Sequence, residues 1–113
     1  ELRGNSISAF DASQLVNLEG LDLSNNQQTW VPVPNEANFD PTLSSLNINS
    51  LSKLKYLNVT NQLLTSLDLT QSPLLEIVDC KNNKIENSLD ISQNSKLTYL
   101  DCSTNQIKTI LLP

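Results

Sequence analysis

A nine-residue leucine pattern recurs along this chain and constrains its fold more than any other feature. Each copy reads L-x-x-L-x-L-x-x-N, with Cys or Val allowed at the sixth place and Gln at the ninth. The four copies span residues 18–26, 54–62, 75–83 and 97–105, so that the last three begin 21 and then 22 residues apart. Self-similarity at such a period is the sequence signature of a repeat architecture, in which each unit buries its apolar face against its neighbours.

A weaker copy of the pattern occupies the second half of each repeat. It is clearest in residues 43–48 (L-S-S-L-N-I) and 64–69 (L-T-S-L-D-L), and residues 7–12, 89–91 and 110–112 fit the same slot. The extra residue of the 22-residue repeat falls between Ile85 and Leu89, and a variable position that ends this half is held by Leu15, Leu51, Ser72 and Asn94. We therefore expect residues 1–113 to form a single domain of about five repeats. Because the pattern is cut at both ends, we expect a piece of a longer protein.

Alternation of apolar and polar residues within each copy is the period of a β-strand. Leu57 and Val59 should point inward and Asn58 outward. Stacking one repeat on the next would pair these short strands in parallel, in a curved or flat right-handed coil with little or no α-helix. At the ninth place an amide side chain can satisfy backbone groups left bare where the chain turns away from the strand. This place is held by Asn5, Asn26, Gln62, Asn83 and Asn105.

The complete pattern, L-x-x-L-x-L-x-x-N-x-L-x-x-L-D-L-x-x-(N/L/Q)-x-x, resembles the short, 21-residue class of bacterial leucine-rich repeats. Residues 97–107 and 64–70 are similar to phrases of internalin-J-like surface proteins, including those of gut Bacteroidetes. The resemblance covers nearly the whole chain. It implies a leucine-rich-repeat solenoid in an extracellular or cell-surface protein used for adhesion or recognition, without implying a particular ligand.

One insertion departs from the repeat. From Leu18 to Leu54 there are 36 residues, 15 more than one repeat, and the excess lies in residues 27–42. This segment holds the only Trp, Trp30, together with Phe39 and three of the five Pro residues. Insertions of this kind form loops that often lie on a functional face, which makes Trp30 a candidate contact residue. The alternative is that Trp30 and Phe39 fold back to fill the core where the insertion separates two repeats.

Composition excludes several functions. A net charge of −5 argues against nucleic acid and anionic membranes as partners, since these are recognised by basic patches. No apolar run is long enough for membrane insertion. The chain has no His and only two Gly residues, so a His-based triad and a Gly-rich phosphate loop are both absent. We expect no enzymatic activity and no cofactor.

Both cysteines occupy inward positions of the pattern. Cys80 and Cys102 stand where Leu23 and Val59 stand in other copies, and the resemblance implies a cysteine ladder. We expect two buried free thiols that act as small hydrophobes. A disulfide is possible by distance, because neighbouring strands lie about 4.8 Å apart. Two side chains that point the same way from parallel strands nevertheless have a poor geometry for a bridge.

Two outward columns are the candidate partner-binding residues. One is apolar and holds Tyr56, Ile77 and Tyr99, flanked at the rim by Glu19, Lys55 and Glu76. The other is polar and holds Asp22, Asn58, Asp79 and Asp101. Exposed aromatic and aliphatic groups side by side are typical of interfaces, although these side chains could merely cover one another. The half-repeats give a similar column of Asp11, Asn47, Asp68 and Asp90 without aromatics. Stacked carboxylates could attract a cation, but calcium needs six to eight oxygens from several directions, so we predict no metal site.

Two functions follow. In the first, the chain is a recognition module that binds a protein or glycan partner through the outward face of its main sheet. In the second, it is a passive spacer that displays other domains of a surface protein. The ends lack a visible capping motif, so end-to-end self-association is a further expectation.

Overall fold

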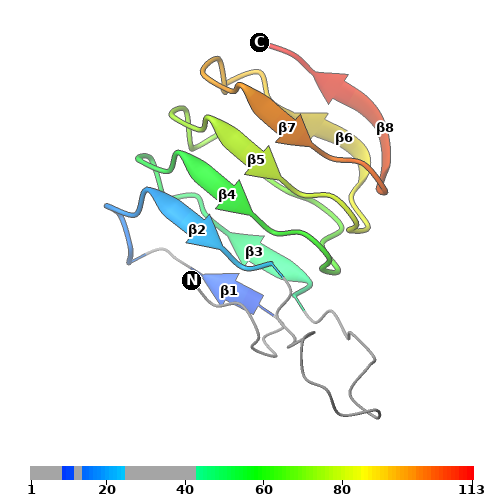
Figure 1. Cartoon of the computed structure of the whole chain (residues 1–113), viewed down its shortest axis with the longest axis horizontal. Helices are drawn as coiled ribbons and strands as arrows, with labels where there is room; N and C mark the ends of the chain where they lie inside the picture. The colour runs from blue at the N-terminus through cyan, green and yellow to red at the C-terminus, as the bar shows by residue number, and fades with distance from the viewer. Residues whose placement is uncertain (1–8, 12–13, 25–42) are drawn as a thin grey trace.

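The computed structural model describes residues 9–11, 14–24 and 43–113, and within them it contains eight β-strands and no helix. The expected scarcity of helix is confirmed for this part of the chain. The strands are β1 (Ala9–Asp11), β2 (Gly20–Asp22), β3 (Ser45–Asn47), β4 (Tyr56–Asn58), β5 (Ile77–Asp79), β6 (Glu86–Asp90), β7 (Tyr99–Asp101) and β8 (Gln106–Leu111). Figure 1 shows the strands in two layers, between which the chain passes back and forth.

Every strand pair in the described part of the chain is parallel, as the sequence predicts. One layer is a four-stranded sheet in the order β2-β4-β5-β7, called here the front sheet. The other layer contains two separate pairs, β1-β3 and β6-β8. The register of the front sheet follows the repeat, because Leu57 pairs with Leu21 and Val78, and Val78 pairs with Leu100. Equivalent positions of successive copies therefore lie side by side.

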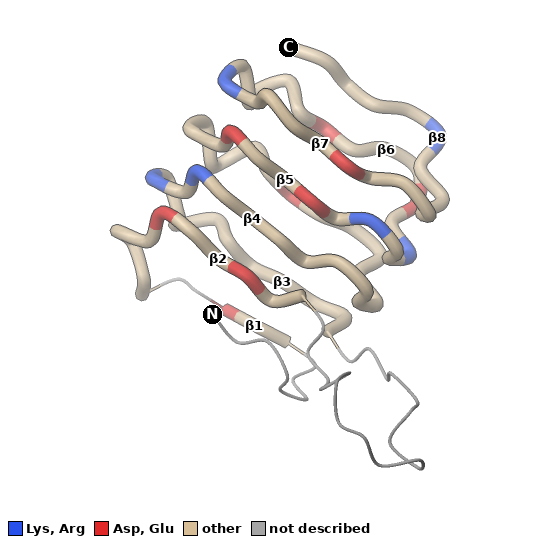
Figure 2. The backbone as a smooth tube through the Cα atoms, in the orientation of Figure 1, with Lys and Arg blue, Asp and Glu red and all other residues tan. Residues whose placement is uncertain are grey.

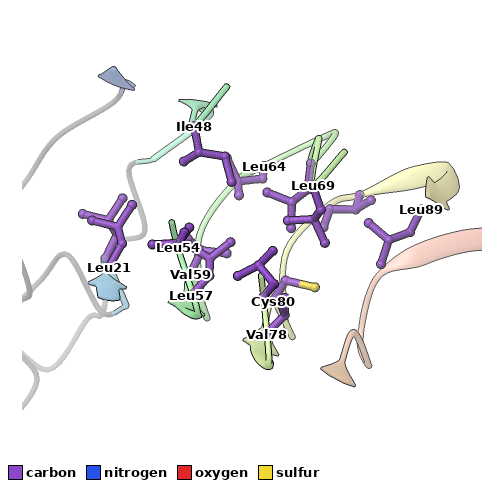
Figure 3. Packing of buried hydrophobic residues seen from close by; sticks show 14 of the residues in the cluster. Leu21, Ile48, Leu54, Leu57, Val59, Leu64, Leu69, Val78, Cys80 and Leu89 are labelled. Atoms are coloured by element: carbon purple, nitrogen blue, oxygen red, sulfur yellow. The ribbon is translucent and has the colours of Figure 1, made fainter. Parts of the chain in front are cut away.

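The core lies between the two layers and consists almost entirely of the leucine positions of the pattern. Figure 3 shows these side chains converging from both layers. Leu57 and Val59 are fully buried, whereas Asn58 between them is not, which confirms the predicted alternation. Each fully buried Leu or Val stabilises the fold by about 1.5–3 kcal/mol relative to an exposed one. Fully buried core residues include Leu23, Leu43, Leu51, Leu54, Leu64, Leu69, Leu75, Val78, Cys80, Ile85 and Leu89.

The second layer differs from the expectation of a strand in every half-repeat. Residues 64–69 lie between the two strand pairs but form no strand, although Leu64, Leu67 and Leu69 are buried as predicted. Backbone hydrogen bonds from Lys84 N to Leu64 O and from Glu86 N to Thr65 O reach only the beginning of this segment. The apolar core is thus continuous where strand pairing is not.

The irregularity of the 22-residue repeat falls where the sequence places its extra residue. The register of the β6-β8 pair shifts between Asn87 and Ser88, and Asn87 has a φ of 66°. This left-handed backbone conformation is tolerated by Asn better than by most residues. Across this shift β6 advances by one residue and β8 by two, so the register passes over Lys108 of β8, and Leu89 returns to the core with no exposed surface.

Burial decreases at β7, the edge strand of the front sheet. Leu97, Leu100 and Cys102 are only partly buried, whereas the equivalent Leu75, Val78 and Cys80 are fully buried. The expectation of two buried thiols is therefore right for Cys80 and wrong for Cys102. The reason is that a strand packs on both sides of β5 but on only one side of β7.

A search of the described residues finds no helix long and apolar enough to cross a membrane.

Candidate functional site

An exposed apolar column crosses the front sheet, in agreement with the sequence prediction. Tyr56, Ile77 and Tyr99 begin β4, β5 and β7 and are neighbours in the sheet register. Their exposed fractions are 37%, 40% and 50%. Gly20 continues the column on β2, and a Cβ atom there would lie 3.8 Å from Cδ2 of Tyr56. Because Gly20 has no side chain, the Tyr56 ring has no side-chain neighbour from that position.

The polar column runs parallel to the apolar one, on the residue that ends each strand. The pairs Asp22–Asn58, Asn58–Asp79 and Asp79–Asp101 are all in register. In each residue, Oδ1 accepts a hydrogen bond from the backbone N–H two residues ahead, at 3.0–3.3 Å. This is the local turn that Asp and Asn favour. The column therefore has a structural role that the sequence analysis missed: it turns the chain away from each strand.

The second layer repeats this arrangement. Oδ1 of Asn47, Asp68 and Asp90 accepts the N–H two residues ahead at 2.9–3.0 Å. Hydrogen bonds from the Ser92 side chain and then from its backbone hold the pKa of Asp90 below its usual value. The polar columns of the two layers thus share one local function, and among the described residues only the front column lies beside exposed aromatic rings.

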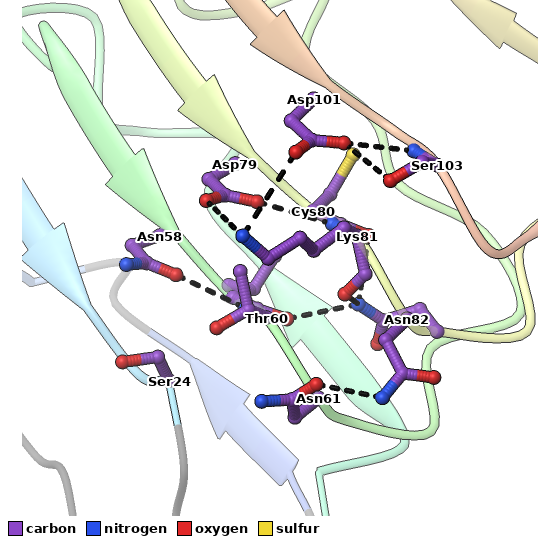
Figure 4. A network of polar contacts seen from close by, with 12 residues as sticks. Ser24, Asn58, Thr60, Asn61, Asp79, Cys80, Lys81, Asn82, Asp101 and Ser103 are labelled. Atoms are coloured by element: carbon purple, nitrogen blue, oxygen red, sulfur yellow. Dashed lines mark hydrogen bonds and ion pairs between the residues drawn. The ribbon is translucent and has the colours of Figure 1, made fainter.

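Lys81 places its ammonium group between two carboxylates of the front column. Its Nζ lies 3.6 Å from Oδ2 of Asp79 and 3.9 Å from Oδ2 of Asp101, as Figure 4 shows. Hydrogen bonds from the Ser103 hydroxyl at 2.6 Å and from its backbone lower the pKa of Asp101, and the Lys81 charge contributes less. In both residues Oδ1 is used in the local turn and Oδ2 is directed toward the lysine.

At the other rim of the apolar column, Lys55 lies 3.7 Å from the Glu19 carboxylate, and both side chains are at least half exposed. Exposed pairs of this kind contribute little to stability. Glu76 occupies the equivalent place before β5 and is exposed. The apolar column therefore lies between two charged margins. Acidic residues of both margins are visible on β2, β5 and β7 in Figure 2.

Amide side chains at the ninth place hydrogen-bond to backbone groups at the turn after each strand, as predicted. Asn83 Nδ2 donates to the carbonyls of Val59, Cys80 and Lys81, and its Oδ1 accepts from Leu64 N at 3.1 Å. Gln62 and Asn105 make corresponding bonds to their own and the preceding repeat. These amides replace the backbone partners that the turn removes, so they fix each strand against its neighbour.

One feature of the turns was not expected from the sequence. The eighth place has a left-handed backbone in Asn61, Asn82 and Thr104, with φ between 55° and 61°. The preference of Asn for this conformation was a usable signal.

The variable position that ends the half-repeat is buried in Leu51, Ser72 and Asn94, whereas Leu15 is 47% exposed. Ser72 Oγ donates to Leu51 O at 2.9 Å, and Asn94 Nδ2 donates to Leu69 O and Ser72 O. Ser24 and Thr60 follow the inward residues Leu23 and Val59, so strand alternation would direct them outward. Both are nevertheless buried. For Ser24, the side chain turns to its neighbour, because Oγ donates to Asp22 Oδ1 at 2.6 Å.

Trp30 lies outside the described residues. Among the described residues, no group of three or more His, Cys, Asp or Glu side chains could hold a metal ion. Both thiols are free. Burial, followed by the charges of Cys102, Asp79 and Asp101, raises the pKa of Cys80 to about 12, and burial also raises that of Cys102. High pKa values make both thiols poor nucleophiles.

Comparison with known proteins returns no matching family model and no matching curated protein.

Proposed function

We propose that this chain is a leucine-rich-repeat solenoid of the internalin-J-like class and serves as a non-catalytic recognition module. Its partner, a protein or a glycan, contacts the outward face of the front sheet. The observation that carries this proposal is the exposed column of Tyr56, Ile77 and Tyr99, residues that are 37–50% exposed. Aromatic residues at the centre of a charged rim are the usual anchors of a protein interface.

Four features support the solenoid part of the proposal. Strands 21 and 22 residues apart pair in parallel and in register. Inward leucines share one core. Amide side chains link successive repeats. From β4 to β8 the chain passes back and forth between the two layers. An extracellular or cell-surface location belongs to this proposal, because it follows from the resemblance of the repeat pattern.

Absence of catalysis is also part of the proposal. The chain has no His, and both thiols have raised pKa values. The carboxylates of the front column already accept hydrogen bonds from their own turns. These groups are suited to structure and to charge recognition, and not to proton transfer or nucleophilic attack.

A passive spacer is the second candidate. It is favoured by the regularity of the repeat and by the structural use of the polar column, since neither feature requires a ligand. End-to-end self-association remains a prediction for either function. The partly buried Leu97 and Leu100 and the exposed Leu111 and Leu112 lie at the edge where it would occur.

A capture experiment distinguishes recognition from spacing. The native chain and a Tyr56→Glu/Tyr99→Glu variant are used to capture proteins and glycans from mucosal and bacterial surface extracts. Ser66→Glu/Ser88→Glu is the matched control, because it adds the same two charges at exposed positions of the other layer. All three proteins must have the same circular dichroism spectrum.

The recognition proposal expects a partner that the native chain and the control retain and the tyrosine variant loses. A partner retained equally by all three proteins would contradict the front face as the binding site. Capture of nothing specific would favour the spacer.

A further inference from the structure

The net charge of the described residues is concentrated on the front sheet. The count includes each strand of the front sheet, the residue before it and the two residues after it. These residues hold five carboxylates and two lysines, a surplus of three negative charges. The carboxylates belong to Glu19, Asp22, Glu76, Asp79 and Asp101. Elsewhere in the described residues four carboxylates and four lysines cancel. A partner complementary to this face therefore carries positive charge.

On β7 an aromatic ring and a carboxylate lie at a distance that suits one particular side chain. Tyr99 and Asp101 lie two residues apart on one strand, so their Cα atoms are about 7 Å apart. A guanidinium group is planar, stacks on aromatic rings and pairs with carboxylates. It can therefore contact the ring and the carboxylate together, and its aliphatic stem can lie along Ile77.

The Oδ2 atoms of Asp79 and Asp101, whose side chains are 17% and 26% exposed, are held only loosely by the chain's own cation. Lys81 Nζ lies 3.6 Å and 3.9 Å from Oδ2 of Asp79 and Asp101. Charge-assisted hydrogen bonds between nitrogen and oxygen are shorter, about 2.7–2.9 Å. Lys81 therefore neutralises this pair from a distance without hydrogen-bonding to it, and a guanidinium group can compete for the same oxygens.

We propose that the front face binds a basic protein segment whose arginine side chains lie over Tyr56 and Tyr99 and pair with Asp79 and Asp101. The inference rests on the proposed recognition function and specifies its partner. Lys81 then acts as an internal competitor that weakens binding. A neutral glycan would use the rings but gain nothing from the surplus charge, so it is the alternative that the test must separate.

Strand spacing suggests a probe. Tyr56 and Tyr99 are two strands apart, which places their Cα atoms about 10 Å from each other. In a polyproline II helix, residues three apart lie on one side and about 9 Å apart. The peptide Gly-Arg-Pro-Pro-Arg-Pro-Pro-Gly therefore presents two arginines at nearly the required distance. Its control is the same peptide with citrulline, which keeps the shape of arginine and removes the charge.

Titration calorimetry measures the affinity of both peptides for the native chain and three variants. We expect the arginine peptide to bind about tenfold more tightly than the citrulline peptide. Asp79→Asn/Asp101→Asn should weaken binding about tenfold, and Lys81→Gln should strengthen it about threefold. Asp68→Asn/Asp90→Asn is the matched control and should change nothing, because it removes two charges from the same turns in the other layer. Asn47 and Asn58 occupy equivalent positions naturally.

Equal affinity for the two peptides, or weaker binding by Lys81→Gln, would overturn the proposal. A partner captured through Tyr56 and Tyr99 whose affinity is unaffected by Asp79→Asn/Asp101→Asn would also overturn it and leave the recognition function intact. Failure to capture any partner through the tyrosines would instead reject the recognition function itself.

Discussion

Replacement of Asn83 by Ala tests how the repeats are held together. Asn83 is 8% exposed and makes four hydrogen bonds to backbone groups of two neighbouring repeats. Asn83→Ala leaves at least Leu64 N–H and Val59 C=O without a partner among fully buried residues. Each unsatisfied buried group costs about 1–3 kcal/mol. With some relaxation of the turn, we expect the free energy of unfolding to fall by about 3–5 kcal/mol.

Asn105→Ala is the matched comparison. Asn105 makes the same kinds of bonds, to Ile85 N and to the carbonyls of Cys80, Cys102 and Ser103, but it is only half-buried. Water can replace part of this network, so the expected loss is about 1–2 kcal/mol. Urea unfolding followed by circular dichroism measures both variants. Equal losses, or a loss below about 1 kcal/mol for Asn83→Ala, would refute the view that buried amides join the repeats.

Three further predictions concern the turns and the thiols. Thr104 has a φ of 55°, a left-handed conformation that costs most residues about 1–2 kcal/mol and is better tolerated by Gly and Asn. Thr104→Asn should therefore raise the free energy of unfolding, measured in urea, by about 1 kcal/mol. No gain would show that the turn is unstrained. At about pH 8, iodoacetamide should modify half-buried Cys102 before Cys80, whose pKa burial raises to about 12; equal rates by mass spectrometry would contradict this order. The pKa values of Asp90 and Asp101 lie below 3.8 in the folded chain, so their stabilisation is complete above the unfolded value and is lost as the pH falls through the lower folded one. Asp90→Asn/Asp101→Asn should flatten the acid-induced loss of stability seen in thermal unfolding below about pH 4, and an unchanged slope would contradict the shifts.

The front sheet could be predicted from the sequence in detail. Its copies of L-x-x-L-x-L-x-x-N align without gaps, so the register of Tyr56, Ile77 and Tyr99 follows from counting residues. Inward burial of Leu57 and Val59 follows from strand alternation. The role of Asn83 follows because a turn beside a buried strand leaves backbone groups that need a partner.

Other features depend on local geometry that the pattern does not encode. Residues 64–69 carry the leucine positions of a strand but form none, a difference that the pattern does not show. Cys80 and Cys102 occupy the same position of the repeat, so the pattern does not distinguish them. Cys102 is partly exposed because it follows an edge strand. Ser72 and Asn94 are buried because their side chains donate hydrogen bonds to carbonyls of other repeats, and the pattern does not show these bonds.

Amide chemical-shift mapping of the isotope-labelled chain, with a partner purified by capture, tests most directly where recognition occurs. The account predicts shift changes concentrated on β4, β5 and β7, centred on Tyr56, Ile77 and Tyr99. Changes concentrated on β6 and β8, with the front sheet unaffected, would contradict the central claim.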